Sequence, residues 1–251
     1  MDKKPDNSSP ITRRSFIGNG SKIASVGALA GVVLPVVHGK TEDITKIALV
    51  GCGGRGTGAA SNALSVSLAH GPTKLVAMAD VFENRLNSSY NGLVKRHKDK
   101  VDVPPDRKHI GFDSYKKAMD TLDPGDIAIF TTPCAFRWVH FEYAIKKGLN
   151  VFMEKPVTPD GFSSRKMLEL NKLAKKKNLK VGVGLMCRHS QARRELFSRI
   201  KDGELGEILA LRAYRMQGPI ASCFSGKKPA EEKELMYQIR RFHSFLWLSG
   251  G

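Results

Sequence analysis

Short, almost continuous apolar runs alternate along the chain with longer segments in which apolar residues recur every three or four positions. The short runs predict buried strands at residues 47–50, 75–79, 126–131, 150–153 and 180–185, with a shorter strand at 109–112. The longer segments predict helices in the Ala-rich stretch after residue 56 and at 83–96, 114–119, 137–147 and 163–177. This alternation predicts an α/β fold, a doubly wound parallel (Rossmann) sheet over residues 44–186.

The alternation ends near residue 187. A helix is expected at 191–200, a strand-like run at 208–214 and a helix at 237–248 that leads into two final glycines. A single helix and strand cannot bury a face by themselves. We therefore expect residues 187–251 to be a partial C-terminal domain, the start of an incomplete α+β substrate domain.

Residues 1–40 have the pattern of an export signal rather than of a folded element. A polar start leads into TRRSFI at 12–17, and an apolar stretch rich in Ala, Gly and Val follows at 23–37. A charged region before a short apolar region is typical of signal peptides, and the paired arginines resemble the twin-arginine motif. We expect a twin-arginine-type signal, the matching export machinery as a partner, and a periplasmic protein. The alternatives are an uncleaved segment that anchors the protein in the membrane and a basic–apolar segment that arose by chance.

The composition and charge of the chain limit the kinds of molecule that it is expected to bind. The 251 residues are 41% hydrophobic, and the net charge is +17. The lysine clusters carry no interleaved aromatic residues and match no nucleic-acid-binding motif, so we predict solvated faces and no nucleic-acid partner. The four cysteines have none of the short spacings of metal or redox sites, so we predict no metal.

A glycine-rich turn directly follows the first strand. Gly51, Gly53 and Gly56 form a G-x-G-x-x-G pattern, with Gly54 and Arg55 between the last two. Such a turn between a strand and a helix suits a dinucleotide: the first glycine permits the turn, the second lets the backbone approach the pyrophosphate, and the third allows close packing. The helix N-terminus then points unpaired N–H groups at the phosphates. We predict that these five residues bind a cofactor.

Asp80 ends the second expected strand. A carboxylate a little over twenty residues after the glycines is suited to accept hydrogen bonds from the adenosine ribose hydroxyls. This carboxylate favours NAD over NADP as the cofactor because it repels a 2′-phosphate. The nearby Arg85 leaves NADP as the alternative cofactor.

Other polar residues follow the remaining strands at the same sheet edge. Thr131, Thr132 and Pro133 are placed to meet cofactor phosphate or ribose, although capping of the next helix explains them equally well. His140 lies in that helix, where a lone histidine is more often a structural hydrogen-bond partner than a catalyst. Arg188 follows the last strand and is a candidate contact for an anionic or hydroxyl-rich substrate.

Lys155 is the best candidate for a reactive group. It follows Glu154 at a strand end and precedes a proline that stiffens the turn. A lysine near the nicotinamide can hydrogen-bond a substrate hydroxyl, stabilise the charge that develops there and share its proton. An exposed Glu–Lys surface pair is the alternative.

These motifs together resemble the Gfo/Idh/MocA oxidoreductases, the relatives of glucose-fructose oxidoreductase and inositol dehydrogenase. The resemblance is carried by the twin-arginine start and by VGCGGRG at 50–56, ADVF at 79–82, TTP at 131–133, WVH at 138–140, GLNVFMEKP at 148–156 and VGLMCRH at 183–189. The Glu-Lys-Pro after a short strand is its most specific part. The resemblance implies an NAD(P)-dependent enzyme that acts on sugars, polyols or related carbohydrates.

Carried over to this chain, the resemblance assigns roles to single residues. The glycine turn and Asp80 bind the dinucleotide, and Thr131, Pro133 and His140 flank its phosphate and nicotinamide ribose. Glu154 and Lys155 lie by the reacting carbon, with Glu154 also against the cofactor. Lys155 and Arg188 contact the substrate.

Two departures from the family pattern change the expectation. The family usually continues past the Gly-Gly into an Asp-rich turn, a helix with a catalytic His, and an open antiparallel sheet through which relatives often pair. We therefore expect a truncated member, with homo-oligomerisation left open. Met186 also stands where many relatives have Gln.

Two other functions are compatible with the same sequence features. The resemblance includes glycosidases of the same fold that use tightly held NAD. A cofactor-binding remnant without catalysis is the other alternative.

Overall fold

The computed structural model describes residues 44–66, 71–216, 218, 222 and 226–250. The predicted signal at 1–40 lies outside the described residues. Among the helices within these ranges, none is both long and apolar enough to cross a membrane.

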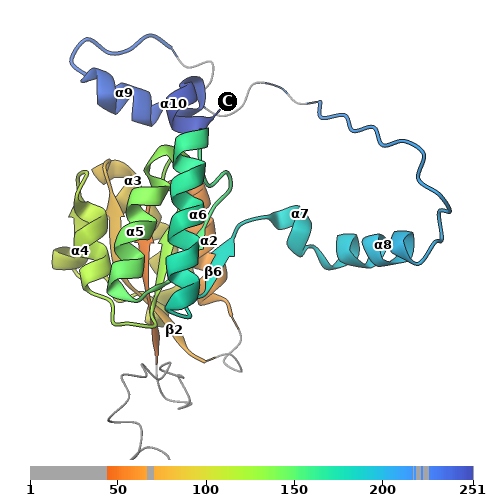
Figure 1. Cartoon of the computed structure of the whole chain (residues 1–251). Coiled ribbons are helices and arrows are strands. Elements are labelled where there is room, and N and C mark those ends of the chain that lie inside the picture. Colours follow the sequence, from red (N-terminus) through yellow and green to blue (C-terminus); the bar gives the residue numbers. More distant parts are fainter. Residues whose placement is uncertain (1–43, 67–70, 217, 219–221, 223–225, 251) are drawn as a thin grey trace, which may run out of the picture. The chain divides into compact units, whose positions relative to one another are not determined.

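A six-stranded sheet forms the centre of the fold (Figure 1). Its strands are β1 (Thr45–Val50), β2 (Thr73–Asp80), β3 (Lys108–Ile110), β4 (Ile127–Phe130), β5 (Asn150–Met153) and β6 (Val181–Val183). Every neighbouring pair is parallel, and the order is β3-β2-β1-β4-β5-β6. This is the strand order of a Rossmann fold, which confirms the predicted fold class.

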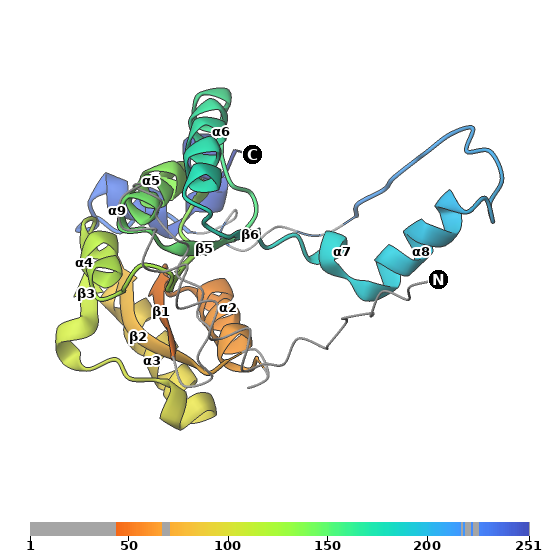
Figure 2. The same cartoon turned by 60° about the horizontal axis from the view of Figure 1, so that its bottom comes forward.

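Helices cover both faces of this sheet (Figure 2). They are α2 (Gly54–Leu64), α3 (Glu83–His97), α4 (Ser114–Asp120), α5 (Arg137–Lys147) and α6 (Gly161–Lys176), with 3₁₀ turns at Lys98–Lys100, Pro105–Arg107 and Cys134–Phe136. Alternate residues of β1 enter different cores. Ala48 and Val50 join the core under α4, α5 and α6, whereas Ile47 and Leu49 join the one under α2 and α3. Burial on both faces explains why the strands read as continuous apolar runs.

The chain reverses direction across the sheet between β1 and β4. From β1 the connections run outward through β2 to β3, and from β4 they run the opposite way to β6. A crevice opens at the carboxyl ends of strands where the order reverses. The turn after β1 and the Thr131–Thr132–Pro133 segment after β4 both lie there.

After β6 the expected pattern holds only in part. Helix α8 (Gln191–Lys201) confirms the helix expected at 191–200, and the short helix α7 (Met186–His189), which the sequence did not predict, precedes it. The strand expected at 208–214 is wrong, because these residues are exposed and irregular. A strand needs a hydrogen-bonded neighbour, and the described residues pair none with this run. The helix expected at 237–248 is interrupted into α9 (Glu234–Arg240), a 3₁₀ turn (Phe242–Ser244) and α10 (Leu246–Ser249).

These last helices pack on the Rossmann fold near the carboxyl ends of β2 and β4. Ile239 and Leu248 are buried with Phe82, which directly precedes α3, and with Phe136 from the 3₁₀ turn after β4. The Cys134 thiol donates to the carbonyl of Leu248 at 3.2 Å. Part of the apolar surface of the C-terminal segment is therefore covered by the Rossmann half of the chain.

Gly148 provides a test of the fold. It ends α5 with a φ of +73°, and an added Cβ would lie 3.3 Å from the Cβ of Pro124. Because left-handed backbone disfavours a side chain, Gly148→Ala should lower the free energy of unfolding by about 1–2 kcal/mol in denaturant titrations.

Gly92 is the matched control. It lies inside α3, where a Cβ would meet nothing within 4 Å. Gly92→Ala should leave stability unchanged or raise it by up to about 1 kcal/mol, because alanine favours helix. Equal effects of the two substitutions would contradict this assignment.

Candidate dinucleotide-binding site

The glycine turn is fixed by close backbone contacts. Gly51 has a φ of +95°, and its N–H donates to the carbonyl of Ala79 at 2.8 Å. A Cβ on Gly56 would lie 2.0 Å from the carbonyl oxygen of Gly51, so only glycine lets α2 approach this closely. The hydroxyl of Thr131 donates to the same carbonyl at 2.5 Å. The Thr131 side chain at the end of β4 therefore stabilises the conformation of the glycine turn.

The start of α2 is open to a ligand. Its N-cap, Gly53, provides no side-chain hydrogen bond, and its first turn carries no acidic residue. Added Cβ atoms on Gly53 and Gly54 would meet nothing within 4 Å. The first N–H groups of a helix lack intrahelical acceptors and attract anions. The open start of α2 therefore has the geometry that a pyrophosphate needs.

Asp80 links the end of β2 to the turn. Its Oδ2 accepts from the backbone N–H of Cys52 at 2.6 Å, and its Oδ1 accepts from that of Phe82 at 2.8 Å. A carboxylate has about four acceptor positions, so capacity remains for ribose hydroxyls.

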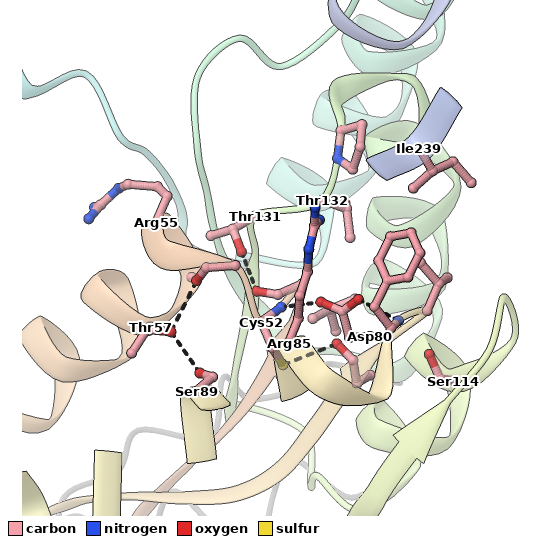
Figure 3. A pocket seen from close by; sticks show the side chains of 18 of the residues that line it. Cys52, Arg55, Thr57, Asp80, Arg85, Ser89, Ser114, Thr131, Thr132 and Ile239 are labelled. Carbon is pink, nitrogen blue, oxygen red and sulfur yellow. Dashed lines mark hydrogen bonds between the residues drawn. The ribbon is translucent and has the colours of Figure 1, made fainter. Parts of the chain in front are cut away.

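These groups line one cavity of about 950 Å³ (Figure 3). Most of the predicted site residues contribute to its wall: Gly51, Gly53, Gly54, Arg55, Gly56, Asp80, Thr131, Thr132, Pro133 and His140. The C-terminal segment adds Ile239, Phe242 and His243, which the sequence patterns did not identify. The segments that contribute lie far apart in the chain.

His140 lies in the wall of the cavity next to Thr132. It is 7% exposed, and its Nδ1 is 3.3 Å from the Thr132 hydroxyl. Its ring also lies against Tyr115 and Phe136, with centroids 4.4 and 6.4 Å apart. Burial, with a smaller effect of the Arg137 charge, lowers the pKa of His140 to about 3. The imidazole is therefore neutral and acts as a hydrogen-bond partner at neutral pH.

Arg137 is a buried residue that the sequence patterns missed. Its guanidinium donates to the carbonyl of Thr132, at 2.9 Å from Nε and 2.6 Å from Nη2, and also to the carbonyl of Glu154. Burial lowers its pKa to about 10, so it stays charged. It joins the ends of β4 and β5 and fixes their spacing. Nothing in the sequence pointed to this role, because an arginine at the first position of a helix is ordinarily expected to be exposed to solvent.

Glu154 and Lys155 lie beyond this wall. Glu154 is buried, and its Oε1 accepts from Arg55 Nε at 2.7 Å. Lys155 is exposed, and its charge, together with the larger effect of burial, lowers the pKa of His243. Neither residue lines the cavity, whereas His243 does.

Arg188 is not brought to this site. It lies in α7, is exposed and does not line the cavity. In the described part of the chain, no group of three or more His, Cys, Asp or Glu side chains could hold a metal ion.

Comparison with known proteins identifies the family. Residues 45–185 match the profile of the GFO_IDH_MocA oxidoreductase family, described as an NAD-binding Rossmann fold. The match covers more than half of the chain. The chain belongs to the Gfo/Idh/MocA family. The glycine turn and Asp80 are thus part of that family's NAD-binding fold.

The curated relatives of this Gfo/Idh/MocA chain include inositol 2-dehydrogenases. That of Corynebacterium glutamicum is 25% identical over 142 residues, which cover 56% of this chain and 40% of the relative. The enzyme of Leifsonia xyli matches with the same identity and coverage. The chain thus spans about 40% of the length of these relatives.

Solved structures of the family show the same fold. Myo-inositol 2-dehydrogenase from Lactobacillus plantarum is 25% identical with a TM-score of 0.52, covering 66% of this chain and 43% of that one. Scyllo-inositol dehydrogenase from Lactobacillus casei, solved with NAD(H) and scyllo-inositol, has 23% identity and a TM-score of 0.50, with the same coverage. The second likeness supports the fold alone.

The buried imidazole predicts a pH dependence of stability. The ordinary pKa of 6.5 falls to about 3 for His140 in the folded chain. Between these pH values the unfolded chain binds a proton that the folded chain does not. The free energy of unfolding should therefore fall as pH is lowered through this window, by up to about 1.4 kcal/mol per pH unit from this group.

Denaturant titrations across this range would measure the slope. His140→Leu should flatten it, because the titrating group is gone. His189→Leu, at an exposed position in α7, should leave it as it is. An unchanged slope in His140→Leu would refute the assignment.

Proposed function

We propose that the protein is an NAD(P)-dependent oxidoreductase that transfers hydride between nicotinamide and a sugar- or polyol-type substrate. One observation carries this proposal: the bare N-terminus of α2, the Asp80 carboxylate and the Thr132–His140 pair line a single cavity. Groups suited to a pyrophosphate, an adenosine ribose and a nicotinamide ribose thus share one cavity wall. Membership of an NAD-binding oxidoreductase family supports the same function.

The chain's residues divide the cofactor between them. The N–H groups that begin α2 hold the pyrophosphate, and Asp80 accepts from the adenosine ribose. Thr132, Pro133 and His140 meet the nicotinamide ribose. When bound, NAD supplies the hydride acceptor for oxidation of a carbinol carbon.

Oxidation of a hydroxyl to a carbonyl also releases a proton, which this chain has to receive. Lys155 is the candidate proton acceptor: it follows β5, and its charge acts on His243 in the cavity wall. In its neutral form the amine accepts the hydroxyl proton, and as ammonium it stabilises an alkoxide. Glu154, held by Arg55 and by its backbone bond to Arg137, orients the turn that carries Lys155.

The class of substrate is supported by the relatives. The curated matches are inositol 2-dehydrogenases, whose substrate is a cyclic polyol by their names. We therefore take myo-inositol and scyllo-inositol as the first probes.

Gly53 gives a test of cofactor binding. Since a Cβ there meets no protein atom within 4 Å and faces the cavity, Gly53→Val should fold normally but obstruct the pyrophosphate. Titration of the full chain with NADH, followed by nicotinamide fluorescence, should show at least about tenfold weaker binding, a loss of about 1.4 kcal/mol.

Gly182→Val is the matched control. Gly182 lies in the edge strand β6, does not line the cavity, and an added Cβ there would lie 3.5 Å from the Phe152 ring, an ordinary contact distance. It should bind NADH as the parent chain does. Absence of NADH binding by the parent chain would overturn the proposed function, and binding without turnover of inositols would favour a non-catalytic role.

We further propose export by the twin-arginine machinery, from the pattern of residues 1–40. Arg13 and Arg14 together with the following apolar stretch support this proposal. In a bacterial host with this machinery, Arg13→Lys/Arg14→Lys should retain the protein in the cytoplasm, and fractionation would measure it. A periplasmic amount equal to that of the parent chain would contradict export by this route.

A further inference from the structure

Helix α6 carries an excess of basic side chains. Its sequence, GFSSRKMLELNKLAKK, contains five basic residues and a single acidic one, Glu169. That carboxylate is already engaged, because its Oε2 accepts from Lys166 Nζ at 3.2 Å. The four remaining basic residues are exposed and form no ion pair with any other described residue: Arg165, Lys172, Lys175 and Lys176.

The two helices that precede α6 show a different arrangement. Three of the four lysines of α4 and α5 are paired with carboxylates, namely Lys116 with Asp113 at 2.7 Å, Lys146 with Glu142 at 3.0 Å and Lys147 with Asp120 at 3.1 Å. The helix dipole favours lysines in the last turn of α6, but this effect is confined to that turn and does not explain the basic residues before it. The surplus charge of α6 is therefore left for a partner outside the fold.

Large apolar side chains share the exposed surface of α6. Phe162, Leu168 and Leu173 are 57%, 64% and 48% exposed. With 3.6 residues per turn, positions three and eleven residues after Phe162 return to the same side of the helix, so Arg165 and Leu173 lie on one face with it. This face combines unpaired cations with apolar groups that the described residues leave uncovered.

An aromatic pair lies at the beginning of this face. Phe162, in the first turn of α6, meets the Trp138 ring of α5 edge-on, with ring centroids 6.3 Å apart and an interplanar angle of 87°. Trp138 in turn packs against the buried core. Figures 1 and 2 both show α6 on the outside of the fold next to α5. An amphipathic aromatic ring at the edge of an apolar patch is typical of a protein surface that meets a membrane interface.

The chemistry of this face suits a lipid bilayer better than a nucleic acid. Lysine and arginine stems can lie along apolar surface while their charged groups stay with headgroup phosphates, which lets shorter apolar side chains reach the acyl boundary. A nucleic-acid backbone would engage the cations but would offer nothing to Leu168 and Leu173. Both kinds of side chain find a partner only where anionic and apolar layers lie a few ångströms apart.

We propose that the exposed face of α6 docks on a lipid bilayer that carries anionic headgroups. The four unpaired basic residues contact the headgroups, and the exposed apolar side chains enter the boundary between headgroups and acyl chains. This inference is independent of the proposed function, because contact with lipid requires no dinucleotide.

The test maps lysine side chains of the full chain by acetylation and mass spectrometry in the presence of vesicles. Vesicles of phosphatidylglycerol, which is anionic, are compared with vesicles of phosphatidylcholine at equal lipid concentration. Phosphatidylglycerol should slow the acetylation of Lys172, Lys175 and Lys176 by at least about threefold, whereas phosphatidylcholine should not, because the attraction depends on headgroup charge. Salt at about 0.5 M should remove this protection by screening.

Lys95 and Lys98 are the internal control. They are exposed at the end of α3, which packs against the opposite face of the sheet from α6. Their acetylation should stay the same with either kind of vesicle. Since they belong to the same chain, they also distinguish docking through α6 from any attachment through residues 1–40.

Substitutions then locate the contact. Lys172→Gln/Lys176→Gln should raise the phosphatidylglycerol concentration that half-protects Lys175 by about 20–30-fold, because each basic residue near the surface contributes about fivefold. Glutamine suits a helix about as well as lysine, so the fold should be kept. Lys95→Gln/Lys98→Gln removes the same charge from the other side and should change this concentration by less than about twofold. Leu173→Gln should raise it by about tenfold through loss of apolar contact.

Several outcomes would overturn the inference. They are absence of protection on α6, equal protection by the two kinds of vesicle, and equal protection of the α3 lysines. Protection of α6 by a DNA duplex but not by phosphatidylglycerol would assign this face to nucleic acid instead. Thermal unfolding reports the folding of each variant, and if a variant is unfolded, the comparison of the two kinds of vesicle on the parent chain decides. NADH binding is measured separately, so failure here leaves the proposed function standing.

Discussion

The close approach of α2 to the carbonyl of Gly51 is the constraint on which the site depends. Where another residue would place a Cβ, Gly56 leaves room for that carbonyl and for the Thr131 hydroxyl bonded to it. This contact brings the helix N-terminus over the crevice between β1 and β4. The Asp80 carboxylate then fixes the other side of the turn through Cys52 N–H. The ends of β1, β2 and β4 together therefore fix the position of the glycine turn.

A second layer of buried polar groups keeps these strand ends in register. Arg137 bonds two carbonyls at the ends of β4 and β5, and His140 lies between Thr132 and three aromatic rings. Buried polar groups are costly unless they are bonded, so such a network favours one arrangement of the backbone over its neighbours. The part of the cavity wall formed by the ends of β4 and β5 is thus held in one conformation by these hydrogen bonds. Lys155 lies beyond this wall and is exposed.

The sequence predicted the Rossmann half closely because its local signals agree. Apolar runs of strand length, a glycine turn and a helix ended by Gly148 each specify one element, and sheet topology then places their ends together. The positions of these elements in the sequence were enough to predict that the glycine turn, Asp80 and the residues after β4 would meet at one place, and they do line one cavity. The roles within the wall could not be predicted, because Thr131 turns inward to the Gly51 carbonyl and Arg137 is buried only through contacts with distant carbonyls.

The C-terminal segment was predicted poorly for a related reason. Residues 208–214 have strand composition, but composition provides no pairing partner, and in the described residues none is present. The sequence did not indicate that Ile239, Phe242 and His243 would line the cavity, since only the fold brings them next to its other lining residues, which lie between Val50 and His140. Their presence there has a thermodynamic consequence. Any nucleotide that touches this wall is linked by mass action to the docking of α9 and α10, so occupancy of the cavity and order at the far end of the chain rise and fall together.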